Sequence, residues 1–146
     1  MRRPFNAFVA PITLLLQEGN FDARVLEILN VFESRDSYRR GQSALDDLAK
    51  SVNLSGSRLR HIFKAETGVS WTKFVKEEKI QRALNLLETS HLSVKEVGTK
   101  VGMNNESQFI RSFKRALGVT PAKYRSRVVP RISQERTQPS RSQKRL

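Results

Sequence analysis

Cysteine is absent from the sequence, which excludes disulfide bonds and thiolate metal sites and is typical of a reducing compartment. Histidine is scarce as well, because His61 and His91 are the only two. The metalloprotease pattern HExxH, the phosphate-binding P-loop and the GxGxxG fingerprint are all missing, and no Ser-His-Asp set is recognisable. We therefore expect a protein that is not an enzyme and that holds no metal ion or cofactor.

Long hydrophobic runs are missing too. The longest apolar stretch, FVAPITLLLQ, is interrupted by Pro11 and Thr13. It is shorter than the roughly 18 residues of a membrane-spanning helix, and it lacks the small-residue cleavage site of a secretory signal. We therefore expect no membrane span and a cytoplasmic location.

Acidic residues are few: 14 Asp and Glu stand against 27 Lys and Arg, which leaves a formal net charge of +13 in 146 residues. A charge of this size attracts polyanions. Nucleic acid is the first candidate partner, and an anionic membrane surface is the second. A basic chain that is merely solvated is the third interpretation.

The apolar residues are concentrated between about Phe21 and Tyr124, whereas 128–146 is nearly all Arg, Ser, Gln and Pro. This basic end lacks the apolar surface that would offset its ordering entropy, so we expect it to be disordered. No strand-like alternation is found, and the helix start signals predict seven helices. These signals are Asn20, Ser43 with Asp46, Ser55, Ser70, Ser93 with Glu96, Asn104 or Asn105, and Thr120 before Pro121.

A repeat with a shift of 50 residues runs through the helical part of the chain. It superimposes aromatic, basic and glycine residues: Phe63 on Phe113, Lys64 on Lys114, Gly68 on Gly118, Val69 on Val119, Lys73 on Lys123 and Phe74 on Tyr124. Just upstream the shift becomes 49, which places Asn53 on Gly102. Asn and Gly both tolerate the left-handed turn that follows a helix. Each copy therefore predicts a short helix, a tight turn and a second helix, which together form a helix-turn-helix unit.

The second helix of each copy is predicted to be amphipathic. The apolar faces consist of Leu59, Ile62 and Phe63 in the first copy, and of Phe109, Ile110, Phe113, Ala116 and Leu117 in the second. The outward faces carry Ser57, His61 and Lys64, flanked by Arg58 and Arg60, in the first copy, and Ser107, Gln108, Arg111, Lys114 and Arg115 in the second. Ser, Gln and Arg can reach base edges in the major groove, while Lys and Arg neutralise phosphates. For either helix alone, an ordinary solvated basic face is the alternative.

A long connector helix is predicted between the two copies, from Trp71 to about Leu87. Its apolar side chains change direction along the helix: Trp71, Phe74 and Val75 lie on one side, and Ile80, Ala83, Leu84 and Leu87 on another. Such a helix can serve one core at each end, and it spans about 25 Å at 1.5 Å per residue.

The segments LAKSVNLSGSRLRHIFKAETGVSWTKFV and GMNNESQFIRSFKRALGVTPAKYR resemble the two halves of the AraC/XylS-type DNA-binding domain of bacterial transcription regulators. The stretch FIRSFKRALGVTPAKYR is similar to the signature segment of that family, and the first half fits mainly through LSxSxLxxxFKxxxG. The resemblance covers about Phe21 to Arg127. It implies an all-α fold in which a long connector helix joins two helix-turn-helix subdomains. It also implies two recognition helices that enter successive major-groove segments on one face of DNA.

Carried over by position, the resemblance implies base contacts from Ser57, Arg60 and His61 in the first recognition helix and from Ser107, Gln108 and Arg111 in the second. Phosphate contacts are expected from Arg58, Lys64, Lys73, Lys114, Arg115 and Lys123. Three places depart from the family pattern: Val97-Gly98 replaces Ile-Ala, Met103 replaces Phe, and Gln108 replaces a common aromatic residue. A glycine within a helix costs about 0.5–1 kcal/mol relative to alanine, so we expect a softer second unit.

These observations divide the chain into an N-terminal extension (1–20), a double helix-turn-helix domain (21–127) and a basic tail (128–146). Within the domain we place the first unit at about 43–68, the connector at about 71–88 and the second unit at about 93–118. The predicted function is a sequence-specific transcription regulator, associated with the nucleoid, that reads an asymmetric site in duplex DNA. RNA polymerase is its expected second partner.

The short stretch ahead of the first helix leaves no room for a sensor domain, so we expect a stand-alone chain that can act as a monomer. The alternative is the C-terminal DNA-binding domain of a larger ligand-responsive regulator, for which a dimer is possible. Two other functions stay open. A membrane-surface protein would need an exposed amphipathic helix, which only FVAPITLLL could supply. RNA binding would need a platform of stacking aromatic residues, whereas the aromatics here fall on core faces.

Overall fold

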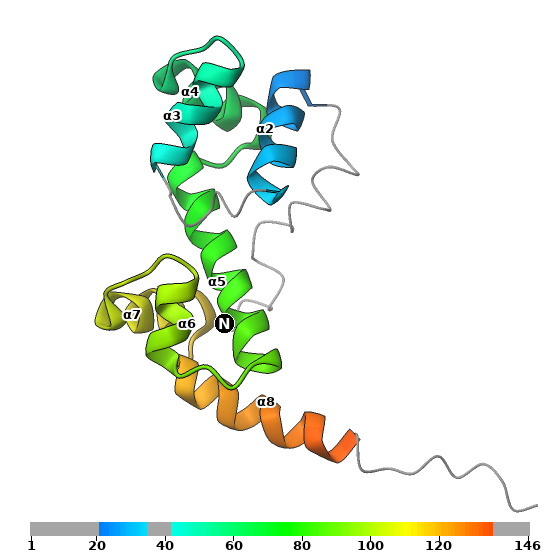
Figure 1. Cartoon of the computed structure of the whole chain (residues 1–146), viewed down its shortest axis with the longest axis vertical. Coiled ribbons are helices and arrows are strands. Elements are labelled where there is room, and N and C mark those ends of the chain that lie inside the picture. Colours follow the sequence, from blue (N-terminus) through cyan, green and yellow to red (C-terminus); the bar gives the residue numbers. More distant parts are fainter. Residues whose placement is uncertain (1–20, 35–41, 136–146) are drawn as a thin grey trace, which may run out of the picture.

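The computed structural model describes residues 21–34 and 42–135, and every regular element in these ranges is an α-helix (Figure 1). The helices are α2 (Ala23–Ser34), α3 (Gln42–Ser51), α4 (Gly56–Thr67), α5 (Trp71–Thr89), α6 (Val94–Lys100), α7 (Glu106–Leu117) and α8 (Pro121–Glu135). This confirms the prediction of seven helices in an all-α fold with a long connector. None of these helices is long and apolar enough to cross a membrane.

The connector is α5, which carries one group of helices at each end (Figure 1). α2, α3 and α4 pack together around the start of α5, and α6, α7 and α8 pack around its second half. The two groups are therefore joined by a continuous helix and not by a loop.

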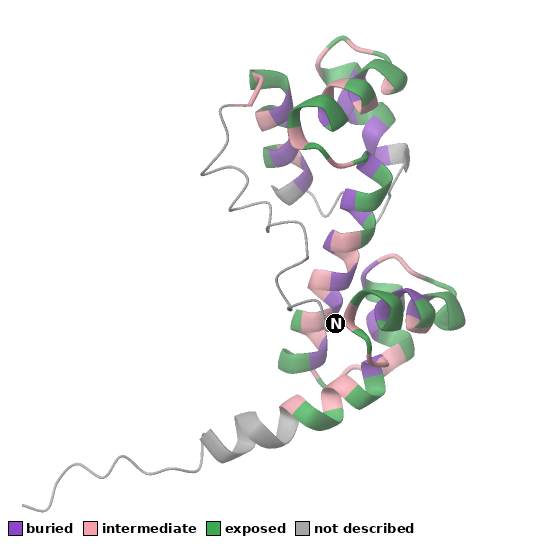
Figure 2. Cartoon of the chain, turned by 180° about the vertical axis from the view of Figure 1, so that it is seen from behind, coloured by how far each residue is buried: buried purple, intermediate pink, exposed green. Residues whose placement is uncertain are grey.

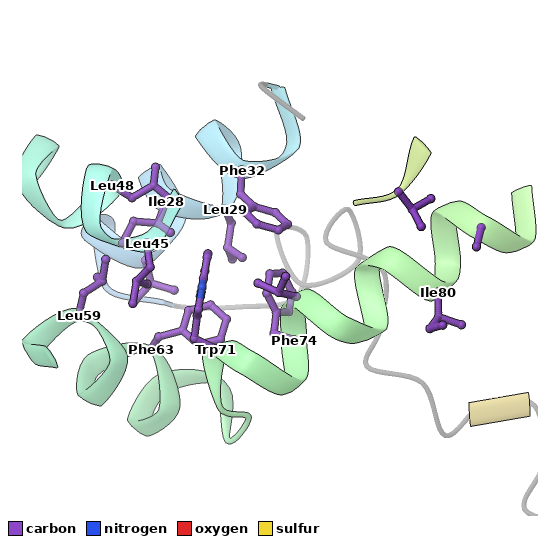
Figure 3. Packing of buried hydrophobic residues seen from close by; sticks show 14 of the residues in the cluster. Ile28, Leu29, Phe32, Leu45, Leu48, Leu59, Phe63, Trp71, Phe74 and Ile80 are labelled. Carbon is purple, nitrogen blue, oxygen red and sulfur yellow. The ribbon is translucent and has the colours of Figure 1, made fainter. Parts of the chain in front are cut away.

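The apolar side chains of α5 change sides along the helix, as predicted. Near its start, Trp71 and Phe74 are buried in an aromatic cluster with Phe32 of α2 and Phe63 of α4 (Figure 3). The ring centroids in this cluster lie between 5.1 and 5.7 Å apart, in the edge-on and tilted arrangements that aromatic pairs prefer. Further along α5, the buried apolar residues are Ile80, Ala83 and Leu87, while Leu84 is only partly buried. One helix thus contributes to the core at both ends.

The helix starts follow the predicted capping signals. Five side chains accept a hydrogen bond of 3.0–3.3 Å from the backbone N–H three residues further on: Ser55, Ser70, Ser93, Asn105 and Thr120. At Ser93 the capping box is complete, because the Glu96 carboxylate accepts the Ser93 backbone N–H at 2.7 Å. That hydrogen bond also lowers the pKa of Glu96. Each such cap stabilises its helix by about 1 kcal/mol.

Two expected caps turn out differently. The helix predicted to start after Ser43 begins at Gln42, so Ser43 lies inside α3 and does not precede it. Asp46, expected to complete a capping box with Ser43, instead lies 3.8 Å from the guanidinium of Arg60 on α4. Asn20 lies outside the described residues, and α2 begins at Ala23, with the Asp22 side chain accepting the backbone N–H of Arg24.

The last helix is longer than predicted. α8 continues to Glu135, into the stretch that was expected to be a tail, while 136–146 lies outside the described residues. The composition of this stretch indicates only that it has little apolar surface to bury. Extending a helix that is already nucleated needs no such surface, because propagation fixes one residue for each hydrogen bond gained. α8 also passes through Pro130, although a proline inside a helix removes one backbone hydrogen bond.

The first turns of α8 are attached firmly to α5. The Arg125 guanidinium donates to the backbone carbonyls of Leu87, at 3.2 Å, and Leu92, at 2.5 Å. The Tyr124 ring packs edge-on against Phe113, with centroids 5.9 Å apart, and its hydroxyl donates to the carboxylate of Glu88. These contacts supply the nucleus from which the rest of α8 extends.

Tyr124 should titrate at unusually high pH. Partial burial, followed by the hydrogen bond to Glu88 and its charge, raises the pKa of Tyr124 to about 12. Because the folded-state pKa lies above the unfolded value of about 10, this contribution to stability is fully present below pH ~10 and is lost as the pH rises towards 12. An ultraviolet titration of phenolate absorbance should show the late transition, and Glu88→Gln should move it to lower pH. Tyr124→Phe assigns the signal, because Tyr38 is the only other tyrosine. An unchanged midpoint in Glu88→Gln would show that the carboxylate does not hold the phenol.

Candidate nucleic-acid interface

Two tight turns with the same backbone geometry precede α4 and α7. Asn53 has a φ of 55° and Gly102 a φ of 80°, so both occupy the left-handed region. The backbone N–H of Leu54 donates to Ala49 at 2.8 Å, and that of Met103 donates to Gly98 at 2.7 Å. These paired residues are 49 positions apart, which is the shift found in the sequence. The predicted helix-turn-helix geometry is therefore present in both units.

The helices that follow these turns, α4 and α7, also match. Each has 12 residues, and they begin at Gly56 and Glu106. Each ends at a left-handed glycine, Gly68 with a φ of 74° and Gly118 with a φ of 77°. A side chain at either glycine would be strained by that φ. The repeat in the sequence thus corresponds to a repeat in the backbone.

Nearly all of the predicted contact residues are exposed; Figure 2 shows the exposed parts of both units in green. Of the predicted base-contacting residues, Ser57, His61, Ser107, Gln108 and Arg111 are exposed, and Arg60 is partly buried. The predicted phosphate-contacting residues are all exposed: Arg58, Lys64, Lys73, Lys114, Arg115 and Lys123. These side chains lie on α4 and the start of α5 in the first unit, and on α7 and the start of α8 in the second. Their roles toward DNA stay predictions.

Lys73 and Lys123 occupy equivalent places outside α4 and α7. They lie in the first turns of the next helices, α5 and α8, and their backbone N–H groups donate to the caps Ser70 and Thr120. Lys73 also has the carboxylate of Glu77 at 4.0 Å, one helical turn away. The Lys73 side chain is itself exposed and the separation is long for an ion pair, so the Lys73 charge stays accessible to a polyanion.

The inner faces of α4 and α7 are buried largely as predicted. Leu59 and Phe63 of α4 are fully buried, as are Phe109 and Phe113 of α7. Two positions on α7 differ from the prediction: Ala116 is exposed, and Ser112, which was not placed on the apolar face, is buried. Residue 112 follows the outward Arg111 and precedes Phe113, so it lies at the border between the two faces.

The two units lie at opposite ends of α5. Figure 1 shows α3 and α4 around the start of the connector and α6 and α7 beside its second half. An extended partner that follows the connector could therefore contact α4 and α7 together.

Asp46 is a residue that the sequence analysis did not connect with this surface. Its carboxylate lies against the first residue of α4, so close that a Cβ at Gly56 would be 2.3 Å from Asp46 Oδ1. The same oxygen is 3.8 Å from the guanidinium of Arg60, and both side chains are about half exposed (57% and 43%). The contact with Asp46 therefore favours one position of the Arg60 side chain, which is a predicted base-contacting residue. A glycine at the first position of an exposed helix is the sequence signal that could have indicated the close approach.

Lys79 is a second residue that the sequence analysis missed. It lies on α5, and its ammonium group donates to the backbone carbonyl of Gly102, in the turn before α7, at 3.2 Å. Partial burial lowers the pKa of Lys79. In the sequence, this contact could have been suspected because Lys79 stands next to Ile80, on a part of the connector that is predicted to be buried.

The glycine in α6 has a packing role that the sequence analysis did not foresee. Gly98 is buried, and a Cβ there would lie 3.0 Å from the ring of Phe109 and 3.1 Å from the backbone oxygen of Met103. An alanine could be accommodated only if the ring or the turn moved. Alanine at position 98 would favour the helix through its higher propensity. The close packing of α6 on α7 opposes the added side chain.

Comparison with known proteins agrees with this geometry. A family model described as "Helix-turn-helix domain" matches residues 48–127. An uncharacterized HTH-type transcriptional regulator of Bacillus subtilis, YfiF, is 39% identical over 82 residues, which are 56% of this chain and 26% of the relative. The arabinose operon regulatory protein of Escherichia coli is 34% identical over 79 residues, 54% of this chain and 27% of the relative. The chain thus spans less than a third of the length of these curated relatives.

Solved structures share the fold. The DNA-binding domain of AdpA, described as a global transcriptional factor and solved in complex with a target DNA, has a TM-score of 0.65 and 26% identity. That similarity covers 77% of this chain and 99% of the AdpA domain. The C-terminal domain of AraT, a response regulator from Geobacillus stearothermophilus, has a TM-score of 0.64 at 22% identity, covering 87% of this chain and 96% of the AraT domain.

Proposed function

Since the chain belongs to the AraC/XylS-type family of helix-turn-helix DNA-binding proteins, we propose that it is a transcription regulator that reads one asymmetric site in duplex DNA through α4 and α7. The observation that carries the proposal is the pair of matching turn-and-helix units, one at each end of a continuous helix (Figure 1). Successive major-groove segments on one face of a duplex lie about 34 Å apart. The 19 residues of α5 span about 28 Å at 1.5 Å per residue, and the units at its ends extend that reach.

Within each unit, the proposed roles follow from position and side-chain chemistry. Residues near the N-terminal ends of α4 and α7 reach base edges, because the beginning of a recognition helix lies deepest in the major groove. Arg111 donates to guanine, and Gln108 suits adenine. Lys64 and Lys114, one turn further along the helices, contact phosphates.

The site is asymmetric because the two recognition helices differ in their outward residues. α4 presents Ser57, Arg60 and His61, while α7 presents Ser107, Gln108 and Arg111. A chain with two different reading surfaces matches two different half-sites, so one monomer occupies one site. RNA polymerase is the proposed second partner, since regulation requires that DNA binding be communicated to transcription. We place the protein in the cytoplasm, at the nucleoid, and assign it no catalytic activity.

Arg111→Ala and Lys114→Ala should have different effects, although both remove one exposed cation from α7. Loss of a base contact should cost about 1–3 kcal/mol on the preferred site and relax the preference at one base pair. Loss of a phosphate contact should weaken binding to all sequences alike and reduce the salt slope by about 1. Binding to a library of single-base variants at several salt concentrations separates the two results. Equal behaviour of the two variants would overturn the assignment of these roles.

Competition between polyanions tests the proposed function as a whole. A labelled duplex bound by the chain should be displaced by unlabelled duplex of the same sequence far better than by a structured RNA of equal length or by anionic lipid vesicles. Equal displacement by RNA would favour RNA binding, and equal displacement by vesicles would favour a membrane-surface role.

A further inference from the structure

The contact between Lys79 and Gly102 joins the connector directly to the second turn. Lys79 lies on α5, and the 3.2 Å hydrogen bond from its Nζ ends on the carbonyl of the left-handed residue Gly102. α7 begins at Glu106, four residues beyond that carbonyl. A movement of the turn would therefore be passed directly to the reading end of α7.

The turn itself is tightly built. The backbone N–H of Gly102 donates to Thr99 at 3.0 Å, and that of Met103 donates to Gly98 at 2.7 Å. Gly98 lies directly against the Phe109 ring of α7. The turn, the end of α6 and the start of α7 are thus held together as one piece, and a contact at Gly102 acts on all of it.

Other polar contacts attach the second group to the far end of α5. Arg125 donates to the Leu87 carbonyl, and Tyr124 donates to Glu88, both from α8. Leu87 lies eight residues beyond Lys79, which is about 12 Å along the helix. The second group is therefore held at two separated places, and two such attachments resist rotation about α5 better than one.

We propose that Lys79 is a positioning residue: by holding the Gly102 carbonyl it fixes the orientation of α7 relative to α5, and it thereby sets the half-site spacing that the chain accepts. This inference rests on the proposed function, because spacing has a meaning only if both helices read DNA. The ammonium group is suited to the task, since a charge-assisted hydrogen bond to a backbone carbonyl is stronger than a neutral one.

The test compares Lys79→Met with Lys76→Met, its matched control. Lys76 is exposed one turn earlier on the same helix, so both variants lose one positive charge and gain the same side chain. Binding is measured on the preferred site, on the same site with the α7 half-site scrambled, and on sites with one base pair inserted or removed between the halves. Thermal melting of each variant reports on folding, and Lys79→Gln, which keeps a shorter polar side chain, serves as a second variant.

Lys79→Met should bind the preferred site about tenfold more weakly than Lys76→Met, and it should discriminate less between spacings. On the scrambled site the two variants should bind equally, within roughly twofold, because α4 is unaffected. Lys79→Arg should restore much of the spacing preference. If the wild type prefers one spacing and both Lys79→Met and Lys79→Gln keep that preference, the positioning role is wrong while the proposed function stands. If the wild type shows no preference for sequence or spacing, the proposed function fails first, and the positioning role fails with it.

Discussion

Binding of the chain to its duplex site should weaken by about 10³-fold or more when the salt concentration rises from 50 to 200 mM. Six exposed Lys and Arg side chains are assigned to phosphates: Arg58, Lys64, Lys73, Lys114, Arg115 and Lys123. Each phosphate that is neutralised releases condensed counterions, so the logarithm of the affinity falls with the logarithm of salt concentration by about 0.9 per contact. Six to eight contacts therefore give the expected loss. Fluorescence anisotropy with a labelled duplex at several salt concentrations measures the slope.

The double variant Lys64→Ala, Lys114→Ala provides the internal comparison, because it removes equivalent residues from the two repeats. Its slope should be smaller than that of the wild type by about 2. A flat salt response of the wild type would contradict the assignment of nucleic acid as the partner. An unchanged slope in the double variant would show that these two lysines do not contact phosphate.

Inserting 5 bp between the two half-sites should reduce the affinity to that of a single half-site. The insertion turns one half-site to the far side of the duplex, since half a helical turn is about 5 bp. The chain cannot follow, because α5 is continuous from Trp71 to Thr89 and packs against helices of both units. Even at the preferred spacing the reach is tight, so the DNA is expected to bend, at a cost of order 1–6 kcal/mol.

A 10 bp insertion is the control for this experiment. It returns both half-sites to one face but separates them by about 34 Å more, beyond the reach of α5, so it should weaken binding as well. Gel-shift titrations over the series of spacings report both effects. Equal affinity at every spacing would mean that the units act independently or that only one of them reads DNA.

Much of this arrangement could be predicted because its signals are local. The match of Asn53 with Gly102 predicted both turns, since few residues tolerate a positive φ. Caps such as Ser55 and Ser93 fixed helix starts through contacts within four residues. The connector could be recognised because Trp71 and Ile80 point to different sides, which a single core does not require.

The features that sequence analysis missed depend on contacts between distant residues. The Lys79–Gly102 bond joins residues 23 positions apart, and the approach of Asp46 to Gly56 depends on how α3 crosses α4. α8 was underestimated because its first turns gain their stability from α5, through Arg125, and the rest of the helix extends from them. Local sequence patterns predict the helices, whereas contacts between distant residues form only when the helices pack against one another.

One chain is proposed to read two different half-sites on one face of a duplex. Selection of bound sequences from a pool of random duplex DNA tests it most directly. We expect enrichment of one bipartite, non-palindromic motif whose two halves lie about one helical turn, or 10 bp, apart. The same selection with Arg111→Ala should lose one conserved position in one half and leave the other half unchanged. A palindromic motif, a single short motif or no enrichment at all would contradict the account.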